Sequence, residues 1–281
     1  MIKKGKLFLV ATPIGNLEDI TYRAVKVLNE VDVIAAEDTR HSLKLLNHLN
    51  ISKPLISYHR HNEDVKTELL INKILNGENI ALITDAGTPA ISDPGEEVVK
   101  KAIENNIEII PIPGACALIN ALICSGMNTR EFVFYGFLPI NKKLRKNKFA
   151  EIKKENKTII LYEAPHKINQ TLKDILDEIG DVKIVLAREL TKIHEEFIRG
   201  KVSEIIENHS ELKGEMIIII EGNETTNIEN NIIKILNNLS LDEHYEYYKK
   251  QNLEKKEIIK KIAKDRNLSK NDIYMKLINK K

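Results

Sequence analysis

The chain has 281 residues, of which 42% are hydrophobic, and this length is enough for two compact domains and an extension. Its two cysteines, Cys116 and Cys124, are separated by eight positions and have no neighbouring metal-ligand spacing, which argues against structural zinc and a disulfide framework. The apolar run Leu7–Ala11 is too short for a signal peptide, and no stretch has the length of a membrane span. We therefore expect a reduced, cytoplasmic protein that is neither exported nor membrane-bound.

The net charge of +2 conceals a strong segregation of charge along the chain. Residues 141–157 hold 8 Lys/Arg against 2 Asp/Glu, or +6, and residues 240–281 hold 12 against 7, or +5. The rest is acidic: residues 1–140 hold 14 against 17, or −3, and residues 158–239 hold 9 against 15, or −6. An acidic body with two basic segments predicts a polyanionic partner. A general lysine bias is the alternative, and it explains concentrated segments less well.

Short apolar strands alternate with amphipathic helices through the first part of the chain. We expect strands at Leu7–Ala11, Val31–Ala36, near Ile56, Ile80–Ile83 and Ile107–Ile112, with helices between them. This alternation predicts a mostly parallel sheet with helices on its faces, in an α/β domain formed by residues 1–113.

The loop from Thr84 to Gly95 follows the most apolar of these strands and is rich in small and turn-forming residues. Ligands of open α/β sheets bind beyond the carboxyl ends of the strands. Gly87-Thr88-Pro89 leaves backbone groups accessible there and keeps large side chains away. An ordinary strand-to-helix connection would need fewer special residues, so we interpret this loop as a ligand-binding loop.

A second α/β domain is expected over residues 114–223, beginning with an apolar helix at Ala115–Ser125. Its strands are predicted at Phe132–Phe137, Thr158–Tyr162, Val182–Ala187 and Met216–Ile220, and its helices at about 167–179 and 201–209. Residues 224–281 are predicted to form a polar linker and a basic helical tail. Within the tail, Ile259, Ile262 and Ala263 form an apolar face, Leu268 fills the turn, and Ser269 caps a last helix that contains Ile273 and Leu277. This spacing is typical of a helix-turn-helix, although a helical cap on a dimer would also explain it.

The usual cofactor signatures are missing. The sequence contains neither the dinucleotide-binding G-x-G-x-x-G nor the phosphate-binding G-x-x-x-x-G-K-[ST]. Seven of the eight histidines, at positions 41, 48, 59, 61, 194, 209 and 244, show no metal-ligand pattern, so we expect no metal site. From the residues alone we infer an α/β enzyme that binds a nucleotide-like ligand in a cleft, with RNA as a candidate partner.

Eight motifs, in order along the chain, carry a family resemblance. They are Val10–Leu17, Ala36–Arg40, Thr84–Gly95, Pro111–Gly114, Tyr135–Pro139, Tyr162–Lys167, Ala187–Glu195 and Gly214–Met216. Together they resemble the ribosomal RNA small subunit methyltransferase I family, within the tetrapyrrole methylase superfamily. The resemblance implies two α/β domains with the cofactor cleft between them, S-adenosyl-L-methionine as cofactor, and a homodimer. It also implies methylation of the ribose 2′-OH of a cytidine in the decoding region of 16S rRNA, in the small ribosomal subunit.

The same resemblance implies the residues of the cofactor site. They are Pro13, Gly15, Asp85, Gly87, Thr88, Ile91, Cys116, Ala117, Tyr162, Ala187 and Met216. Tetrapyrrole enzymes of the superfamily carry Gly-Asp-Pro where this chain has Gly87-Thr88-Pro89. The missing carboxylate argues against a porphyrin substrate. A small-molecule, tetrapyrrole-type methylase of the same fold remains the alternative, and a purely nucleic-acid-binding module would not need so many special loops.

Methyl transfer to a hydroxyl needs a positioned base, and a nearby cation would stabilise the developing alkoxide. Strand ends facing the cleft offer six candidate catalytic residues: Asp38, Arg40, Glu163, His166, Arg188 and Glu189. Each has a structural alternative. Asp38 is a good helix N-cap, Pro165 could start the helix that follows Glu163, and Arg188 with Glu189 could form an ion pair.

The two basic segments supply candidate RNA contacts, since phosphate neutralisation is the main source of RNA affinity. We assign this role to Lys142, Lys143, Arg145, Lys146, Lys148, Lys260, Lys264 and Lys270.

Overall fold

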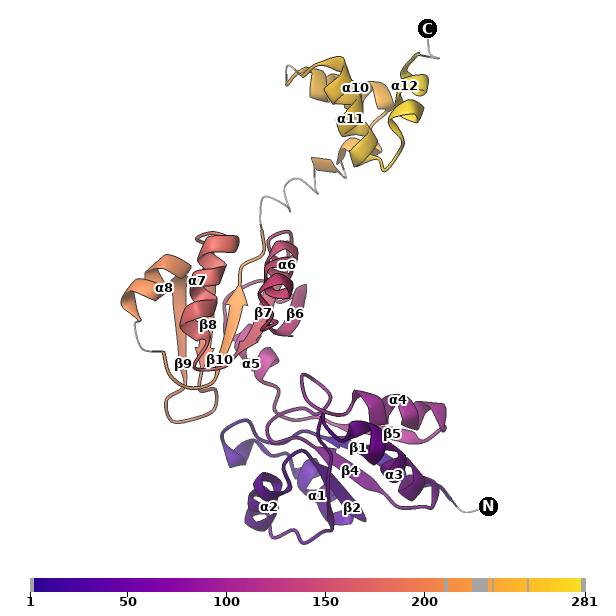
Figure 1. The fold of residues 1–281 in the computed structure, drawn as a ribbon, viewed down its shortest axis with the longest axis vertical. Coiled ribbons are helices and arrows are strands. Elements are labelled where there is room, and N and C mark those ends of the chain that lie inside the picture. Colours follow the sequence, from indigo (N-terminus) through magenta and orange to yellow (C-terminus); the bar gives the residue numbers. More distant parts are fainter. Residues whose placement is uncertain (1–2, 210–211, 224–231, 234, 252, 279–281) are drawn as a thin grey trace. The chain divides into compact units, whose positions relative to one another are not determined.

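The computed structural model describes residues 3–209, 212–223, 232–233, 235–251 and 253–278 (Figure 1). The chain divides into two compact units, one formed by Met1–Lys153 with Lys157–Glu221 and the other by Lys154–Asn156 with Gly222–Lys281. The first unit contains two five-stranded sheets. The boundary expected after residue 113 lies between the last strand of the first sheet and the first helix beside the second, and it stays a prediction because one unit contains both sheets.

The first sheet is parallel throughout, as the alternation of elements predicts. Its strands are β1 (Lys6–Val10), β2 (Val33–Ala36), β3 (Leu55–Ser57), β4 (Ile80–Ile83) and β5 (Glu108–Ile112). They lie in the order β3-β2-β4-β1-β5. Every residue of β2 and β4 is buried, because helices cover both faces of the sheet.

Two helices pack on each face of this sheet. A short 3-10 turn, η1 (Leu17–Asp19), leads to α1 (Tyr22–Glu30), which covers one face with α2 (Thr39–His48). The other face carries α3 (Glu63–Leu75) and α4 (Glu96–Glu104). Caps fix where the first two helices begin: Thr21 Oγ1 accepts the Ala24 N–H, and Asp38 Oδ1 accepts the Arg40 N–H. Because all five strands are parallel, their carboxyl ends lie at the same edge of the sheet.

The second sheet is mixed. Its strands are β6 (Phe132–Phe137), β7 (Thr158–Glu163), β8 (Lys183–Arg188), β9 (Glu196–Lys201) and β10 (Met216–Ile220), in the order β6-β7-β10-β8-β9. Strands β6 and β7 are parallel and the other neighbours are antiparallel. The apolar run of β10 lies at the centre and is buried at every position, as expected. Strand β9 was not predicted, because an edge strand with one fully buried residue, Ile198, shows too weak an apolar pattern.

Helices α6 (Lys142–Ile152), α7 (Ile168–Glu178) and α8 (Val202–Asn208) pack on one face of this sheet, and α5 (Ala117–Ile123) packs on the other. The basic segment 141–157 is thus largely helical, held by buried Phe149 and Ile152. The helix expected at about 167–179 is present, but the alternative in which Pro165 starts it is not what the structure shows. Helix α7 begins at Ile168, after a turn in which the Lys167 N–H donates to the Ala164 carbonyl.

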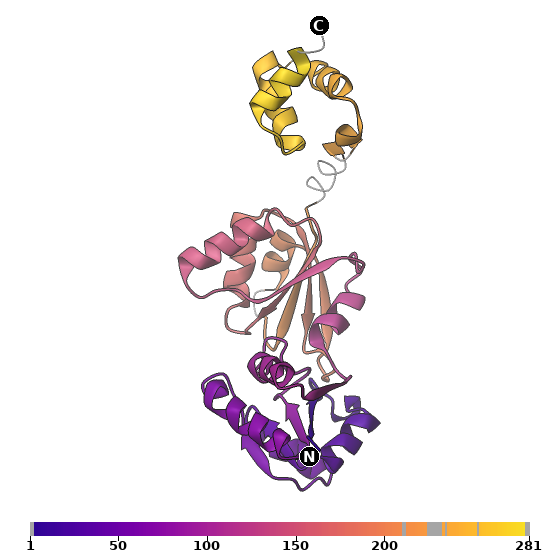
Figure 2. The ribbon, with the colours of Figure 1, turned by 90° about the vertical axis from the view of Figure 1, so that its right-hand side faces the viewer.

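The second unit is a small helical body, drawn in yellow in Figure 2. Helices α10 (Leu241–Lys249), α11 (Lys255–Asp265) and α12 (Lys270–Ile278) surround a core that includes Leu236, Ile258, Ile262 and Ile273. Ser269 caps α12 as predicted, since its Oγ accepts the Asp272 N–H. Leu268 is 40% exposed, so the prediction that it fills the turn is wrong. The linker predicted up to Asn231 lies mostly outside the described residues.

Candidate active site

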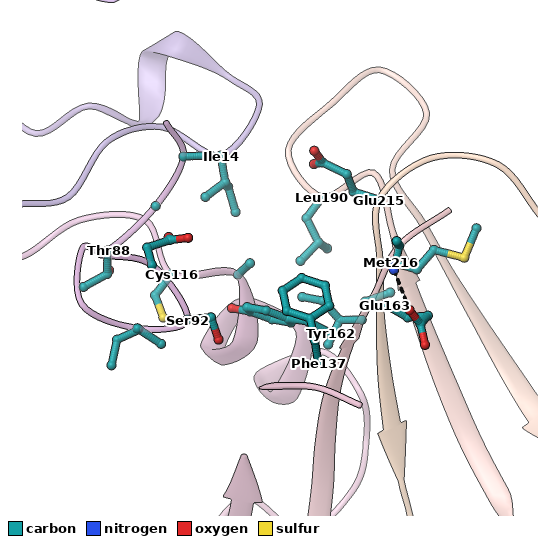
Figure 3. Close-up of a pocket in the computed structure, with 18 of the residues that line it drawn as sticks. Ile14, Thr88, Ser92, Cys116, Phe137, Tyr162, Glu163, Leu190, Glu215 and Met216 are labelled. Carbon is teal, nitrogen blue, oxygen red and sulfur yellow. Dashed lines mark hydrogen bonds between the residues drawn. The ribbon is translucent and has the colours of Figure 1, made fainter. Parts of the chain in front are cut away.

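A pocket of about 390 Å³ lies in the first unit, where loops that follow strands of both sheets meet (Figure 3). Its lining comes from the loops after β1 and β4, the start of α5, the ends of β6, β7 and β8, and the start of β10. The lining residues are Ile14, Ala86, Gly87, Thr88, Ile91, Ser92, Asp93, Cys116, Ala117, Phe137, Tyr162, Glu163, Ala164, Pro165, Ala187, Leu190, Glu215, Met216 and Ile217. A concave, mostly apolar cavity of this size, with a few polar groups, suits a small organic ligand.

The loop after β4 is fixed in place by backbone hydrogen bonds. Thr12 and Gly87 exchange two of them, N–H to carbonyl, at 2.8 and 3.0 Å, and the Thr88 hydroxyl donates to the Ala115 carbonyl at 3.0 Å. Gly87 has φ +85°, a conformation that glycine adopts without strain. Ala90 and Ser92 adopt left-handed backbone with φ +66° and +63°, which residues with a Cβ rarely do. Such strain in an ordered loop is a mark of a functional site.

Eight of the eleven predicted cofactor residues line this pocket. They are Gly87, Thr88, Ile91, Cys116, Ala117, Tyr162, Ala187 and Met216. Pro13, Gly15 and Asp85 do not line it, although Ile14 between the first two does. A Cβ on Gly15 would lie 2.6 Å from Lys192 Cγ, so this glycine allows the loop after β1 to pack against the loop after β8. Asp85 accepts the Asp38 N–H at 3.1 Å and thereby joins the ends of β2 and β4.

Of the six predicted catalytic residues, all of them described, Glu163 alone lines the pocket. Its side chain is buried, and both carboxylate oxygens already accept hydrogen bonds, from the Ala164 N–H at 2.8 Å and the Thr171 hydroxyl at 2.5 Å. Arg145 donates to the same hydroxyl at 2.8 Å, which leaves the Thr171 proton for Glu163. Because both oxygens are engaged, Glu163 is better suited to supporting the pocket wall than to moving a proton.

The other five candidates do not line the pocket, and four of them make structural contacts. Asp38 caps α2, and this contact with the Arg40 N–H, together with the Arg40 guanidinium, lowers the pKa of its carboxyl. Arg188 pairs with Glu196 at 3.5 Å. Glu189 accepts the Glu215 N–H at 2.8 Å, which lowers the pKa of Glu189, and it also pairs with Lys192. The remaining candidate, His166, lies in the turn before α7. The catalytic roles of these five residues, inferred from their places at strand ends, stay predictions.

Asp93 and Phe137 are two of the ten lining residues that were not among the predicted site residues, although both belong to recognised motifs. Asp93 lies in the loop after β4, and Phe137 ends β6. Burial raises the pKa of Asp93 to about 6, and the charges of Glu37 and Asp85 act in the same direction, while the Thr84 hydroxyl and Arg60 oppose them. A carboxyl with this pKa is ionised at neutral pH and basic enough to accept a proton. The signal that could have found it is a carboxylate within a loop already assigned to the ligand.

Aromatic side chains form one wall of the pocket. Tyr162 has Phe134 and Phe137 edge-on beside it, with ring centroids at 4.9 and 5.7 Å. Its hydroxyl accepts the Leu118 N–H at 3.2 Å. Burial raises the pKa of Tyr162 to about 12, so this hydroxyl stays protonated at neutral pH. Figure 3 shows Tyr162 and Phe137 between Thr88 and Cys116 on one side and Leu190, Glu215 and Met216 on the other.

The predicted RNA-binding side chains of α6 differ in their availability. Lys142, Lys143 and Lys146 are exposed, and none of the ion pairs among the described residues involves them. Arg145 instead pairs with Asp174 at 2.7 Å with only 17% of its side chain exposed, and Lys148 pairs with Glu151. In the second unit, Lys260, Lys264 and Lys270 are all exposed.

The described residues bring together no group of three or more His, Cys, Asp or Glu that could hold a metal ion. None of the helices that the structure describes is long and apolar enough to cross a membrane.

Comparison with known proteins identifies the family of this chain. A profile of the family described as Tetrapyrrole (Corrin/Porphyrin) Methylases matches residues 6–206. The ribosomal RNA small subunit methyltransferase I of Halalkalibacterium halodurans is 48% identical over 273 residues, which cover 96% of this chain and 94% of that protein. The chain belongs to the ribosomal RNA small subunit methyltransferase I family. Family members from Bacillus subtilis, 45% identical over 96% of this chain and 93% of that protein, and Thermotoga maritima, 45% identical over 78% of this chain, share this relationship. The Thermotoga protein is matched over its whole length.

Solved structures extend the relationship to the fold of the superfamily. A uroporphyrin III C-methyltransferase from Thermus thermophilus superposes with a TM-score of 0.55 at 16% identity, covering 77% of this chain and 97% of that one. A diphthine synthase gives a TM-score of 0.58 at 12% identity, covering 77% and 90%. A second structure of the Thermus enzyme, in complex with S-adenosylhomocysteine, gives 0.56 at 16% identity, covering 77% of this chain and 97% of that one. These similarities show that this chain has the fold of these methyltransferases.

Proposed function

We propose that this protein transfers a methyl group from S-adenosylmethionine to the ribose 2′-OH of a cytidine in the decoding region of 16S rRNA. Family membership makes the chain an S-adenosylmethionine-dependent methyltransferase that acts on small-subunit ribosomal RNA. The observation that carries the proposal is one pocket in which eight of the eleven predicted cofactor residues meet. The assembled small subunit, a homodimeric enzyme and a cytoplasmic location complete the proposal.

The pocket suits the cofactor. Its volume of about 390 Å³ lies within the range of ligand pockets, and its walls are apolar with a few polar groups. A Cβ on Gly87 would stand 3.2 Å from Ile14 Cγ2, so the backbone of this loop can approach a ligand only as glycine. Gly87 and Thr88 would hold the cofactor from the first sheet, and Tyr162, Ala187 and Met216 from the second. Bound there, S-adenosylmethionine would supply an activated methyl group on its sulfonium.

Positioning is the main task of the protein in such a transfer. Holding a reactant in line with its partner contributes up to about 7–11 kcal/mol in well-oriented systems. The backbone bonds between Thr12 and Gly87 and the packing of Gly15 against Lys192 fix the loops that surround the pocket. The apolar side chains of Ile14, Leu190 and Met216 line the pocket and would limit the access of water to the reacting groups.

The hydroxyl nucleophile must lose its proton as it reacts, and a positioned base contributes roughly 10²–10⁴-fold. Asp93 is the best-placed proton acceptor among the described lining residues, because its carboxyl has a raised pKa and is ionised at neutral pH. Glu163 supports the wall through its bonds to Thr171 and Ala164. Asp93 would take the proton of the ribose 2′-oxygen at a carboxylate oxygen.

Methyl transfer from labelled S-adenosylmethionine tests the proposal directly. The assay compares assembled small subunits, free 16S rRNA and tetrapyrroles, followed by nuclease digestion to nucleosides. We expect label in 2′-O-methylcytidine, with assembled subunits preferred. Label in a modified base, in a tetrapyrrole or in no substrate would contradict the proposed function.

A further inference from the structure

Phe137 is an exposed aromatic ring at the edge of the pocket. It ends β6, lines the cavity and is 57% exposed, although its ring packs in a T-shaped arrangement against the partly buried Tyr162. Two more large apolar side chains follow within seven residues, Ile140 at 83% and Leu144 at 57% exposed. A concentration of exposed apolar groups around a cavity is typical of an interaction surface.

The same segment carries positive charge that local structure does not explain. Lys142 and Lys143 occupy the first turn of α6, where the positive end of the helix dipole makes cations unfavourable. Neither forms an ion pair with any residue that the structure describes, in contrast to Arg145 and Lys148 further along the helix. Lysines of this kind can bind the phosphate of a nucleotide, and an exposed aromatic ring beside them can stack on its base.

We propose that Phe137 is the surface on which the target nucleobase stacks, while Lys142 and Lys143 bind the adjoining phosphates. This inference rests on the proposed function and specifies how its substrate is held. A nucleotide whose ribose must reach a methyl group inside a cavity has to leave its stack, and an aromatic ring replaces the stacking that the base gives up. Phe137 lines the pocket and is exposed, so a base on its free face places the attached ribose at the pocket mouth.

Charge decides between this occupant and a second copy of the chain. An apolar patch flanked by Lys142 and Lys143 is complementary to a polyanion, and the segment 141–157 carries +6 overall. A second copy docked on this patch would bury the same lysines, and burying a charge without a partner is unfavourable. The patch is therefore suited to RNA.

Substitution of Phe137 tests the inference. In Phe137→Ala, kcat/KM for small subunits should fall about ten- to hundredfold, since stacking on an aromatic ring contributes at this level. Phe137→Trp should restore activity, because a larger aromatic surface also stacks. Affinity for S-adenosylhomocysteine, measured by calorimetry, should stay at the wild-type value in both variants. The matched control is Tyr22→Ala, another exposed aromatic residue, which does not line the pocket.

A fluorescent cytidine analogue at the target position of a short 16S rRNA fragment reports stacking itself. Its emission should be quenched on binding to the wild-type protein and to Phe137→Trp, and not on binding to Phe137→Ala. The double variant Lys142→Gln, Lys143→Gln should reduce the log-log salt slope of fragment binding by about 0.7 for each phosphate that the protein no longer neutralises.

The inference fails if Phe137→Ala loses S-adenosylhomocysteine affinity in parallel with activity, because the ring then serves the cofactor. It also fails if kcat/KM and quenching are unchanged in Phe137→Ala. Failure of the proposed function itself looks different, since the wild-type protein would then transfer no methyl group to ribose.

Discussion

Thr12 and Gly87 exchange two backbone hydrogen bonds, at 2.8 and 3.0 Å, although 75 positions separate them in the sequence. This isolated bridge joins the loops that follow β1 and β4, two strands that are neighbours in the first sheet. Gly87 has φ +85° here, and the position that a Cβ would take on it lies 3.2 Å from Ile14 Cγ2. The pocket wall at this point is therefore backbone, fixed from two sides.

Replacement of Gly87 by leucine should abolish cofactor binding. The Cβ of a side chain at this position would lie only 3.2 Å from Ile14 Cγ2, and the rest of the leucine would occupy the cavity. Calorimetric titration with S-adenosylhomocysteine measures the loss. Gly126→Leu is the matched control, because Gly126 has a similar φ of +80° but nothing within 4 Å of the position of a Cβ. If Gly87→Leu bound like the wild type, this loop would not be part of the cofactor site.

Asp93→Asn should retain cofactor affinity and lose methyl transfer by roughly 10²-fold or more, the contribution expected of a positioned base. In the wild type, protonation of a carboxyl with a pKa of about 6 removes the base, so kcat should fall about tenfold for each pH unit below 6. Single-turnover rates between pH 5 and pH 8 measure this profile. Asp93→Glu should restore part of the rate with a displaced profile.

A different outcome would assign Asp93 to the cofactor. If Asp93→Asn weakened S-adenosylhomocysteine binding as much as it slowed methyl transfer, the carboxylate would bind the cofactor and would not act as the base. Glu163→Gln is the comparison, because Glu163 also lines the pocket but has both oxygens engaged by Thr171 and Ala164.

How far the sequence predicts the site depends on which property places each residue. Gly87, Thr88 and Met216 lie at or near ends of strongly apolar strands, so their positions follow from the strand pattern and the motifs together. Asp38 is different, because an aspartate at this strand end suits a helix cap and a catalytic base equally well. The structure shows it as the cap of α2. Only tertiary structure separates such alternatives. Phe137 was missed for a related reason, since a phenylalanine at the end of a strand is usually core.

Arg145 should contribute to stability, whereas its neighbour Lys146 in α6 should contribute to RNA binding. Arg145→Gln removes a guanidinium that bonds Asp174 at 2.7 Å and Thr171 at 2.8 Å, so the free energy of unfolding should fall by about 1–3 kcal/mol. The salt slope of RNA binding should not change. Lys146→Gln is the matched variant, because the Lys146 side chain is exposed and forms no ion pair with the described residues, and it should weaken RNA binding without affecting stability. Urea unfolding and salt-titrated binding measure both quantities, and a reduced salt slope in Arg145→Gln would return this residue to the RNA-binding set.

Removal of the helical tail should leave the fold and cofactor binding of the first unit intact, because the tail forms a separate compact unit with its own core. The natural cut lies after Asn223 and not before residue 240. Leu236 is buried in the tail core, and Arg266 donates to the carbonyl of Leu239, so a later cut would leave fragments of that core behind. The Thermotoga maritima relative, matched over its whole length by 78% of this chain, is a family member of about this size.

The same truncation decides what the tail does. If Lys260, Lys264 and Lys270, all exposed, bind phosphates, the log-log salt slope of binding to small subunits should decrease by about 0.7–0.9 for each phosphate that the truncated protein no longer neutralises. A tail that caps a dimer predicts the opposite pattern, an unchanged slope and a lower molar mass by light scattering. The triple variant Lys260→Gln, Lys264→Gln, Lys270→Gln keeps the tail folded, since its core is formed by Ile258, Ile262 and Ile273. A reduced slope in the triple variant, without a change in molar mass, would assign the tail to RNA binding through its charge.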